Sequence, residues 1–181
     1  MRKLFWKEKF FCGAARGFEH VIGITLGTGL GSACSHFGST RDAALSVTLY
    51  KDKMIEESVS TRGLLNNYFR LTGKRLANAK AISDLYETDK HARTAYSIFA
   101  GDLSWFLAYF IEAESPEVLV IGGNIANASK CFMPEIMQRL NKKITRVPEI
   151  RIAQLGENAA MIGGACGFIQ SSMPQIPGIT N

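Results

Sequence analysis

The sequence predicts an α/β fold in which helices flank a mixed β-sheet and the elements follow the order β-β-β-α-β-α-β-α. Strand-like apolar runs occupy the first third of the chain, and apolar residues at helical spacing follow them. A continuous apolar run over residues 117–121 is typical of a strand buried on both faces of a parallel sheet. With 181 residues, 46% apolar and 20% charged, the chain is expected to form one compact domain.

The first third of the chain is expected to form the end of a helix and then an antiparallel meander. Residues 3–11 have a helical pattern that ends at the glycines of 13–17. The runs that follow are apolar or alternate apolar with polar side chains, and glycine-rich turns separate them. The expected strands are His20–Leu26, Ser32–Phe37 and Leu45–Tyr50.

Helical spacing dominates the middle of the chain. A helix is expected over Thr61–Leu71, with Gly73 at its C-terminal cap, and a shorter one over Ala79–Tyr86. Asp89 has a side chain suited to an N-cap, and the long helix after it is expected to run through Glu114. Ser115-Pro116 then ends that helix because proline cannot continue it.

The last third is expected to complete the sheet with two more strands and two helices. The buried run 117–121 leads into a helix that ends near Leu140, and Ile150–Leu155 and Asn158–Ile169 form the last strand and helix. The tail, 171–181, contains prolines and is expected to be flexible. This order is that of one half of a ribonuclease-H-like, actin-like ATPase fold, in which two halves hold a nucleotide between them.

The charge distribution argues against nucleic acid and membrane partners. Most of the net charge of +5 lies in the first sixteen residues, and no long Lys/Arg run occurs elsewhere. The charged start contains no signal-peptide core, and Gly101 and Asp102 interrupt the apolar stretch 95–113. We therefore expect a cytoplasmic protein.

The cysteines predict reduced thiols and no zinc site. They form no CxxC pair, their neighbours are small or apolar, and three scattered histidines offer no ligand pattern along the chain. The expected buried thiols and core tryptophans are Cys12, Cys34, Cys131, Cys166, Trp6 and Trp105.

The turn Gly27-Thr28-Gly29-Leu30-Gly31 follows the first expected strand. Alternating glycines allow positive φ and a close approach to a ligand, so amide N–H groups can point at an anion, and the threonine hydroxyl adds a donor. The turn has no Gly-Lys-Ser/Thr of a Walker A loop and does not open a helix. It is either a phosphate-binding turn or an ordinary hairpin loop.

A second glycine segment, Gly122-Gly123-Asn124, joins the buried strand to the next helix. Helix N-termini offer unpaired N–H groups, and ligands gather at the carboxyl ends of strands in open sheets. An ordinary βα turn could have the same sequence. In the expected topology, however, both glycine segments lie at the same edge of the sheet and can face one ligand.

Three acidic residues near helix starts are interpreted as structural. Glu157 lies in the first turn of the last helix, where it favours the helix dipole. Glu56 and Glu57 precede the helix that begins near Thr61, and we interpret them as a solvated capping segment.

These segments resemble the ROK family, and glucokinase-like sugar kinases are its most similar members. Thr25–Gly31 is similar to the family's second phosphate motif, and 118–123 to the segment that contacts the adenosine of ATP. The similarity extends from about Gly13–Gly17 to 163–165, and 155–159 is also family-like. The resemblance implies ATP as cofactor, Mg²⁺ carried by the nucleotide, a hexose substrate, phosphate binding by Gly27, Thr28, Gly29 and Gly31, and adenosine binding by Gly122, Gly123 and Asn124.

The sequence departs from the family pattern in three places. The Asp-x-Gly-Gly-Thr loop does not occur, the Asn-Asp pair with the catalytic base would fall at or before Met1, and 53–62 has none of the family's zinc-binding His and Cys residues. We therefore expect 1–170 to be the C-terminal subdomain of a glucokinase-like kinase, without its N-terminal subdomain. No catalytic residue and no metal ligand is assigned, and the chain is expected to be inactive alone.

Two other interpretations remain open. A ROK-type sugar-sensing regulator or interaction module would share the fold without catalysis, although the sequence has no helix-turn-helix such as those regulators carry. A half-enzyme would pair with a separately encoded N-terminal half, and its exposed apolar face would favour self-association.

Overall fold

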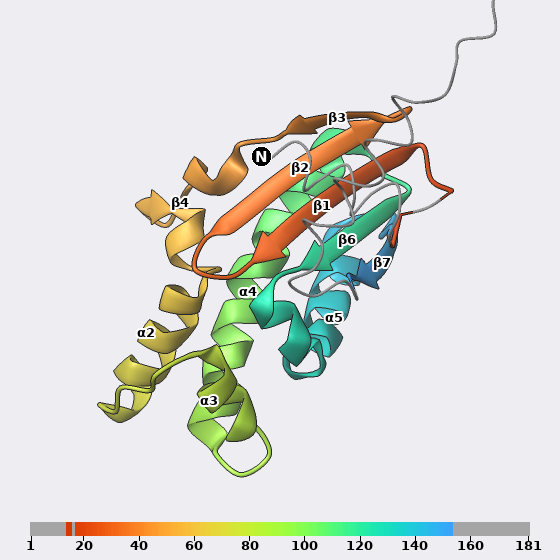
Figure 1. Cartoon of the computed structure of the whole chain (residues 1–181). Helices are drawn as coiled ribbons and strands as arrows, with labels where there is room; N and C mark the ends of the chain where they lie inside the picture. The colour runs from red at the N-terminus through yellow and green to blue at the C-terminus, as the bar shows by residue number, and fades with distance from the viewer. Residues whose placement is uncertain (1–13, 16, 154–181) are drawn as a thin grey trace, which may run out of the picture.

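A five-stranded mixed sheet forms the centre of the computed structural model, which describes residues 14–15 and 17–153 (Figure 1). The strand order is β3-β2-β1-β6-β7. Antiparallel pairing joins the first three strands, and parallel pairing joins β6 to β1 and β7 to β6, as the predicted fold class requires. The strands are β1 (His20–Leu26), β2 (Leu30–His36), β3 (Ser39–Asp42), β6 (Val118–Gly122) and β7 (Glu149–Ile152).

The third strand of the meander lies earlier than predicted, so the assignment of Leu45–Tyr50 is wrong. That segment divides into a 3₁₀ turn, η1 (Leu45–Val47), and the short strand β4 (Leu49–Tyr50), which pairs with β5 (Lys53–Met54) in a separate hairpin. The true edge strand, β3, is polar and largely exposed, so it carries no apolar alternation that the sequence could reveal.

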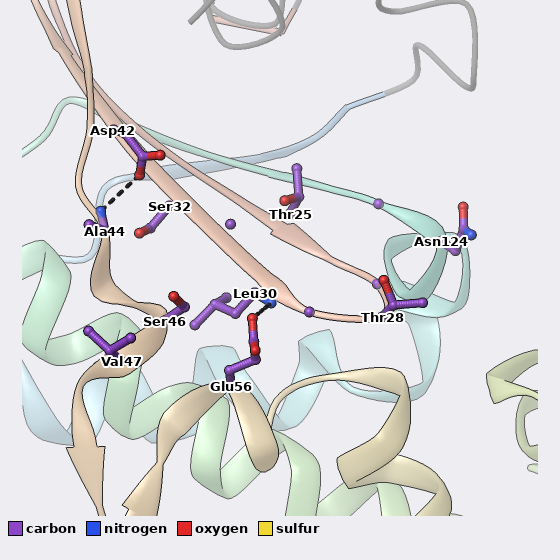
Figure 2. A pocket seen from close by; sticks show the side chains of 14 residues that line it. Thr25, Thr28, Leu30, Ser32, Asp42, Ala44, Ser46, Val47, Glu56 and Asn124 are labelled. Carbon is purple, nitrogen blue, oxygen red and sulfur yellow. Dashed lines mark hydrogen bonds between the residues drawn. The ribbon is translucent and has the colours of Figure 1, made fainter. Parts of the chain in front are cut away.

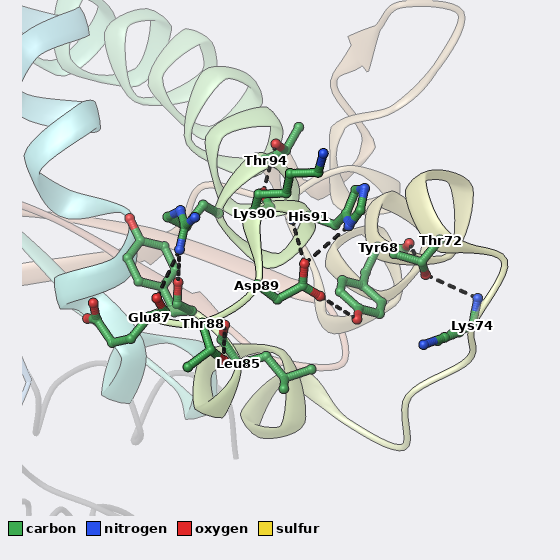
Figure 3. Close-up of polar contacts among 12 residues, drawn as sticks. Tyr68, Thr72, Lys74, Leu85, Glu87, Thr88, Asp89, Lys90, His91 and Thr94 are labelled. Atoms are coloured by element: carbon green, nitrogen blue, oxygen red, sulfur yellow. Dashed lines mark hydrogen bonds and ion pairs between the residues drawn. The ribbon is translucent and has the colours of Figure 1, made fainter.

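The helices follow the prediction closely up to β6. Gly73 caps α2 with a φ of 71°, and Asp89 caps α4 by accepting the His91 N–H at 2.8 Å (Figure 3). The helix expected after Asn124 divides at Phe132 into a 3₁₀ segment and an α-helix. The helical elements are η2 (Ile55–Glu57), α2 (Thr61–Thr72), α3 (Ala79–Asp84), α4 (Lys90–Glu114), η3 (Asn124–Cys131) and α5 (Met133–Lys143).

The main core lies between one face of the sheet and the helices α2, α4 and α5 (Figure 1). Successive side chains of β6 point to opposite faces of the sheet. Leu119 and Ile121 therefore join this core, whereas Val118 and Val120 join a smaller cluster on the other face. None of the helices in the described part of the chain combines the length and the apolar character that a membrane span requires. The largest fully buried side chains include Tyr96, Phe99, Phe106, Phe110 and Phe132.

Some of the residues expected to be buried lie in the described ranges and others do not. Cys34 and Cys131 are buried free thiols, as expected, and Trp105 is only half-buried at the side of the core. The expected helices at 3–11 and 158–169, the tail 171–181, Trp6, Cys12, Glu157 and Cys166 all lie outside the described residues.

Candidate functional site

A pocket of about 560 Å³ opens where β1 ends and β2 begins (Figure 2). The β1–β2 turn forms one side of it, and the turn that follows β6 contributes Gly123 and Asn124. Thr25 of β1 is the register partner of Gly122 in β6, so the carboxyl ends of two parallel strands reach the same edge of the sheet. The fold therefore brings the two glycine segments of the sequence together.

Almost all of the residues proposed to bind a nucleotide line this pocket. Gly122 does not: it is the last residue of β6, and it supports the turn through strand pairing. Those that line the pocket are Gly27, Thr28, Gly29, Gly31, Gly123 and Asn124.

The β1–β2 turn offers two backbone amides to a ligand. Gly27 N–H donates to the Gly29 carbonyl at 3.1 Å, and Leu30 N–H donates to Glu56 Oε2 at 2.9 Å. Within the described part of the chain, the N–H groups of Thr28 and Gly29 have no protein acceptor. Successive amides at such a turn can donate to an anion that enters the pocket.

Positive φ does not explain the glycines of this turn, and close packing explains Gly29. None of Gly27, Gly29 and Gly31 has a positive φ. A Cβ added to Gly29 would lie 2.6 Å from Glu56 Oε2, so a side chain there would displace the carboxylate. A Cβ at Gly27 would meet no atom of the described residues within 4 Å, so they leave that part of the turn open to a ligand.

Gly123 is required by its backbone. Its φ is 94°, and an added Cβ would clash with the Leu26 carbonyl oxygen. The end of β6 therefore packs directly against the end of β1, which places the second glycine segment beside the first.

Glu56 belongs to the pocket, and the prediction that it is a solvated capping residue is wrong. The turn η2 carries it beneath the β1–β2 turn, where it accepts the Leu30 N–H (Figure 2). Glu57 does the predicted capping, since its Oε1 accepts the Met54 N–H at 3.3 Å. Two adjacent glutamates point in different directions from a tight turn, and the sequence contains no signal that separates them.

The charge of the pocket suits a phosphate that arrives with a divalent cation. Asp42 and Glu56 contribute carboxylates, and no Lys or Arg is among the described residues that line it. Mg²⁺ prefers oxygen ligands and is usually held by one or two carboxylates together with phosphate oxygens. Carboxylates are the type of ligand that such an ion takes.

A second pocket of about 420 Å³ adjoins the first through Thr28, which lines both. Thr61 N–H, in the first turn of α2, donates to the Gly27 carbonyl at 2.7 Å and ties the helix to the glycine turn. Arg75 lies over the ring of Phe69, 4.4 Å from its centroid. Sequence reasoning missed this pocket, whose other residues are Thr61, Arg62, Leu65, Asn66 and Leu76.

Comparison with known proteins identifies the family. The model of the ROK family matches residues 51–170, which is more than half of the chain. An N-acetyl-D-glucosamine kinase of Mannheimia succiniciproducens is 23% identical over 181 residues, covering 84% of this chain and 60% of that protein. A glucokinase of Halalkalibacterium halodurans is 28% identical over 139 residues, covering 75% and 39%. The chain thus spans three fifths or less of the length of these relatives.

Solved structures share the fold at low sequence identity. A ROK hexokinase from Thermus thermophilus has a TM-score of 0.81 at 20% identity, with 93% of this chain and 63% of that chain covered. A ROK family glucokinase from Streptomyces griseus, in complex with glucose and AMPPNP, has a TM-score of 0.75 at 20% identity, covering 90% and 64%. A ROK family transcriptional regulator, homologous to the MLC protein of E. coli, has a TM-score of 0.79 at 16% identity, covering 90% and 48%. With this fold and the match of the family model, the chain belongs to the ROK family.

Proposed function

We propose that this chain is the nucleotide-binding part of a ROK-family sugar kinase and that it binds ATP. The observation that carries the proposal is the convergence of two glycine turns on one pocket in which two backbone amides have no acceptor among the described residues. The curated relatives named as N-acetyl-D-glucosamine kinase and glucokinase, and the relative solved with glucose and AMPPNP, support ATP as the donor and a hexose as the acceptor.

Each segment of the pocket has a proposed role. The amides of Thr28 and Gly29 bind phosphate oxygens, with Gly27 and Gly31 keeping that side of the turn free of side chains. The segment Gly122-Gly123-Asn124 binds the adenosine part: Gly123 and Asn124 line the pocket, and Gly122 supports their turn through strand pairing. Glu56 and Asp42 would hold Mg²⁺ through oxygen, and the ion would neutralise charge on the phosphates.

Isothermal titration with Mg-ATP tests the nucleotide site. We expect weak binding, detectable at millimolar ligand, that Gly27→Val abolishes because the new side chain fills the open part of the turn. Glu57→Gln is the matched control, since Glu57 lies outside the pocket, and it should bind like the natural protein. A folded protein that releases no heat with Mg-ATP would contradict the proposal.

We further propose that the chain alone does not phosphorylate a sugar. In the family, an aspartate removes the proton from the sugar hydroxyl that attacks the γ-phosphate. The sequence has no Asn-Asp pair that could supply this base. A coupled assay with ATP and glucose should show no turnover above background. Clear turnover would contradict the proposal that the chain alone is inactive.

The remaining parts of the proposal concern organisation and partners. Residues 1–170 belong to the kinase subdomain, and the protein acts in the cytoplasm. It associates with itself or with an N-terminal half, so sedimentation at high concentration should not show a single monomer.

A sugar-sensing regulator is the second candidate, because the ROK family transcriptional regulator shares this fold. A protein that responds to sugar but not to Mg-ATP in the same titration would favour this second function.

A further inference from the structure

A second group of chemically reactive side chains lies at the opposite end of β2 from the glycine turn. Cys34 and His36 are two residues apart on this strand, so they point to the same face of the sheet. Glu114, the last residue of α4, reaches the same place. The ligand atoms of all three side chains lie within 4.8 Å of one another.

The distances in this group are those of a slightly open metal site. Two ligands of a tetrahedral zinc ion are separated by roughly 3.3–3.7 Å, given bonds of about 2.0–2.3 Å. His36 Nε2 and Glu114 Oε2 are 3.0 Å apart, and the sulfur of the buried Cys34 lies within 4.8 Å of the ligand atoms of both residues. Small side-chain movements would therefore place sulfur, nitrogen and oxygen around one ion.

The neighbouring side chains hold the group in position. His20 Nδ1 lies 2.9 Å from His36 Nδ1, so His36 can donate its Nδ1 proton to His20 when its Nε2 binds a metal. Metal-bound histidines almost always make such a second hydrogen bond. Arg41 donates to Glu114 Oε1 at 2.7 Å, which leaves Oε2 directed at His36.

We propose that Cys34, His36 and Glu114 bind one zinc ion, with water as the fourth ligand. Thiolate, imidazole and carboxylate are the ligand types that zinc takes, and the two negative ligands balance its charge although the Arg41 cation lies nearby. Binding releases the thiol proton. The ion links β2 to the C-terminal end of α4. The sequence predicts no zinc site because that prediction depends on ligand spacing along the chain. Glu114 is far from Cys34 and His36 in the sequence, so spacing cannot reveal this group.

Cobalt(II) replaces zinc in such sites and reports a sulfur ligand by absorption. Titration of the whole chain with Co²⁺ should produce a thiolate-to-cobalt charge-transfer band that saturates at one equivalent and disappears when Zn²⁺ is added. Cys34→Ser should abolish the band, and His36→Gln should weaken Co²⁺ binding at least about tenfold. Cys131→Ser is the matched control, because Cys131 is also a buried free thiol but lies outside the group, and it should keep the band.

Thermal unfolding provides a second test that does not depend on the absorption of bound cobalt. Zn²⁺ should raise the Tm of the natural protein and of Cys131→Ser, but not of His36→Gln, whose half-exposed side chain can change without loss of the fold. The proposal is overturned if the natural protein shows no band, if Cys34→Ser retains it, or if Zn²⁺ raises the Tm of His36→Gln equally. Nucleotide binding has no part in this test.

Discussion

Glu56 shows how one side chain can shape the nucleotide pocket without any special sequence context. Its carboxylate accepts the Leu30 N–H at 2.9 Å and packs against Gly29, so it sets the form of the β1–β2 turn. Glu57, its neighbour, is exposed and makes a long capping bond. The pair therefore offers a comparison of two identical side chains with different partners.

Glu56→Ala should lower the free energy of unfolding by about 1–2 kcal/mol, because a hydrogen bond to a charged group is lost at a partly buried position. Glu57→Ala should change it by less than about 0.5 kcal/mol, as is usual for exposed substitutions. Urea unfolding measures both. Equal losses for the two variants would show that Glu56 does not hold the turn.

Asp89 makes stability depend on pH at the start of α4. Tyr68 donates its hydroxyl to Oδ2 at 2.8 Å and the His91 N–H donates to Oδ1, and these bonds hold the pKa of the Asp89 carboxyl below its usual value (Figure 3). A lowered pKa in the folded state means that the stabilisation is present above the ordinary carboxyl pKa. It is lost as the pH falls through the folded value.

The stability difference between the natural protein and Asp89→Asn should thus be constant near neutral pH and shrink below about pH 4. Denaturant unfolding over a pH series measures it. Tyr68→Phe should show a smaller effect of the same form, since the two hydrogen bonds between His91 and Asp89 remain. A difference that does not vary with pH would exclude this role for the carboxylate.

At the scale of elements, the β4–β5 hairpin is held in an unfavourable conformation by contacts outside it. Lys51 and Asp52 form its turn with φ values of 48° and 63°, although neither is glycine. The Lys51 ammonium lies 2.8 Å from Asp102 Oδ1 on α4, and Tyr50 donates its hydroxyl to the same oxygen at 2.9 Å. Tyr50 and Lys51 therefore bind the hairpin to α4 through Asp102.

Asp52→Gly should raise the free energy of unfolding by up to about 1 kcal/mol, because glycine adopts the left-handed conformation without a Cβ clash. Gly73→Ala, at the end of α2, should lower it by a similar amount, since φ is 71° there. Differential scanning calorimetry would show Tm shifts of opposite sign. Shifts of the same sign would mean that φ does not govern these two positions.

At the scale of the whole molecule, the nucleotide pocket depends on how closely β6 approaches β1. Gly123→Ala should destabilise the protein by at least about 2 kcal/mol, because it combines a positive φ with a clash against the Leu26 backbone. Gly27→Ala should leave stability within about 0.5 kcal/mol, since its Cβ enters open space. Chemical unfolding distinguishes the two, and a tolerated Gly123→Ala would disprove the close approach.

The parts of the fold that could be predicted are those with a strong local pattern. The sequence predicts β6 from its continuous apolar run and α4 from its N-cap and periodic apolar residues, because apolar spacing reflects which face each element buries. The edge strand β3 is polar and exposed, so no such pattern marks it, and the alternating residues after Ala44 resembled a strand more closely. For the same reason, Glu56 could not be distinguished from Glu57.

The sequence by itself determined the family, the order of the elements and the two glycine segments of the candidate site, because these reside in local spacing and short motifs. Only the tertiary structure decided that Glu56 lies under the turn, that a second pocket adjoins it at α2, and that Cys34, His36 and Glu114 meet. Such contacts join residues far apart in the chain. Their positions follow from how the helices pack on the sheet, which no local pattern encodes.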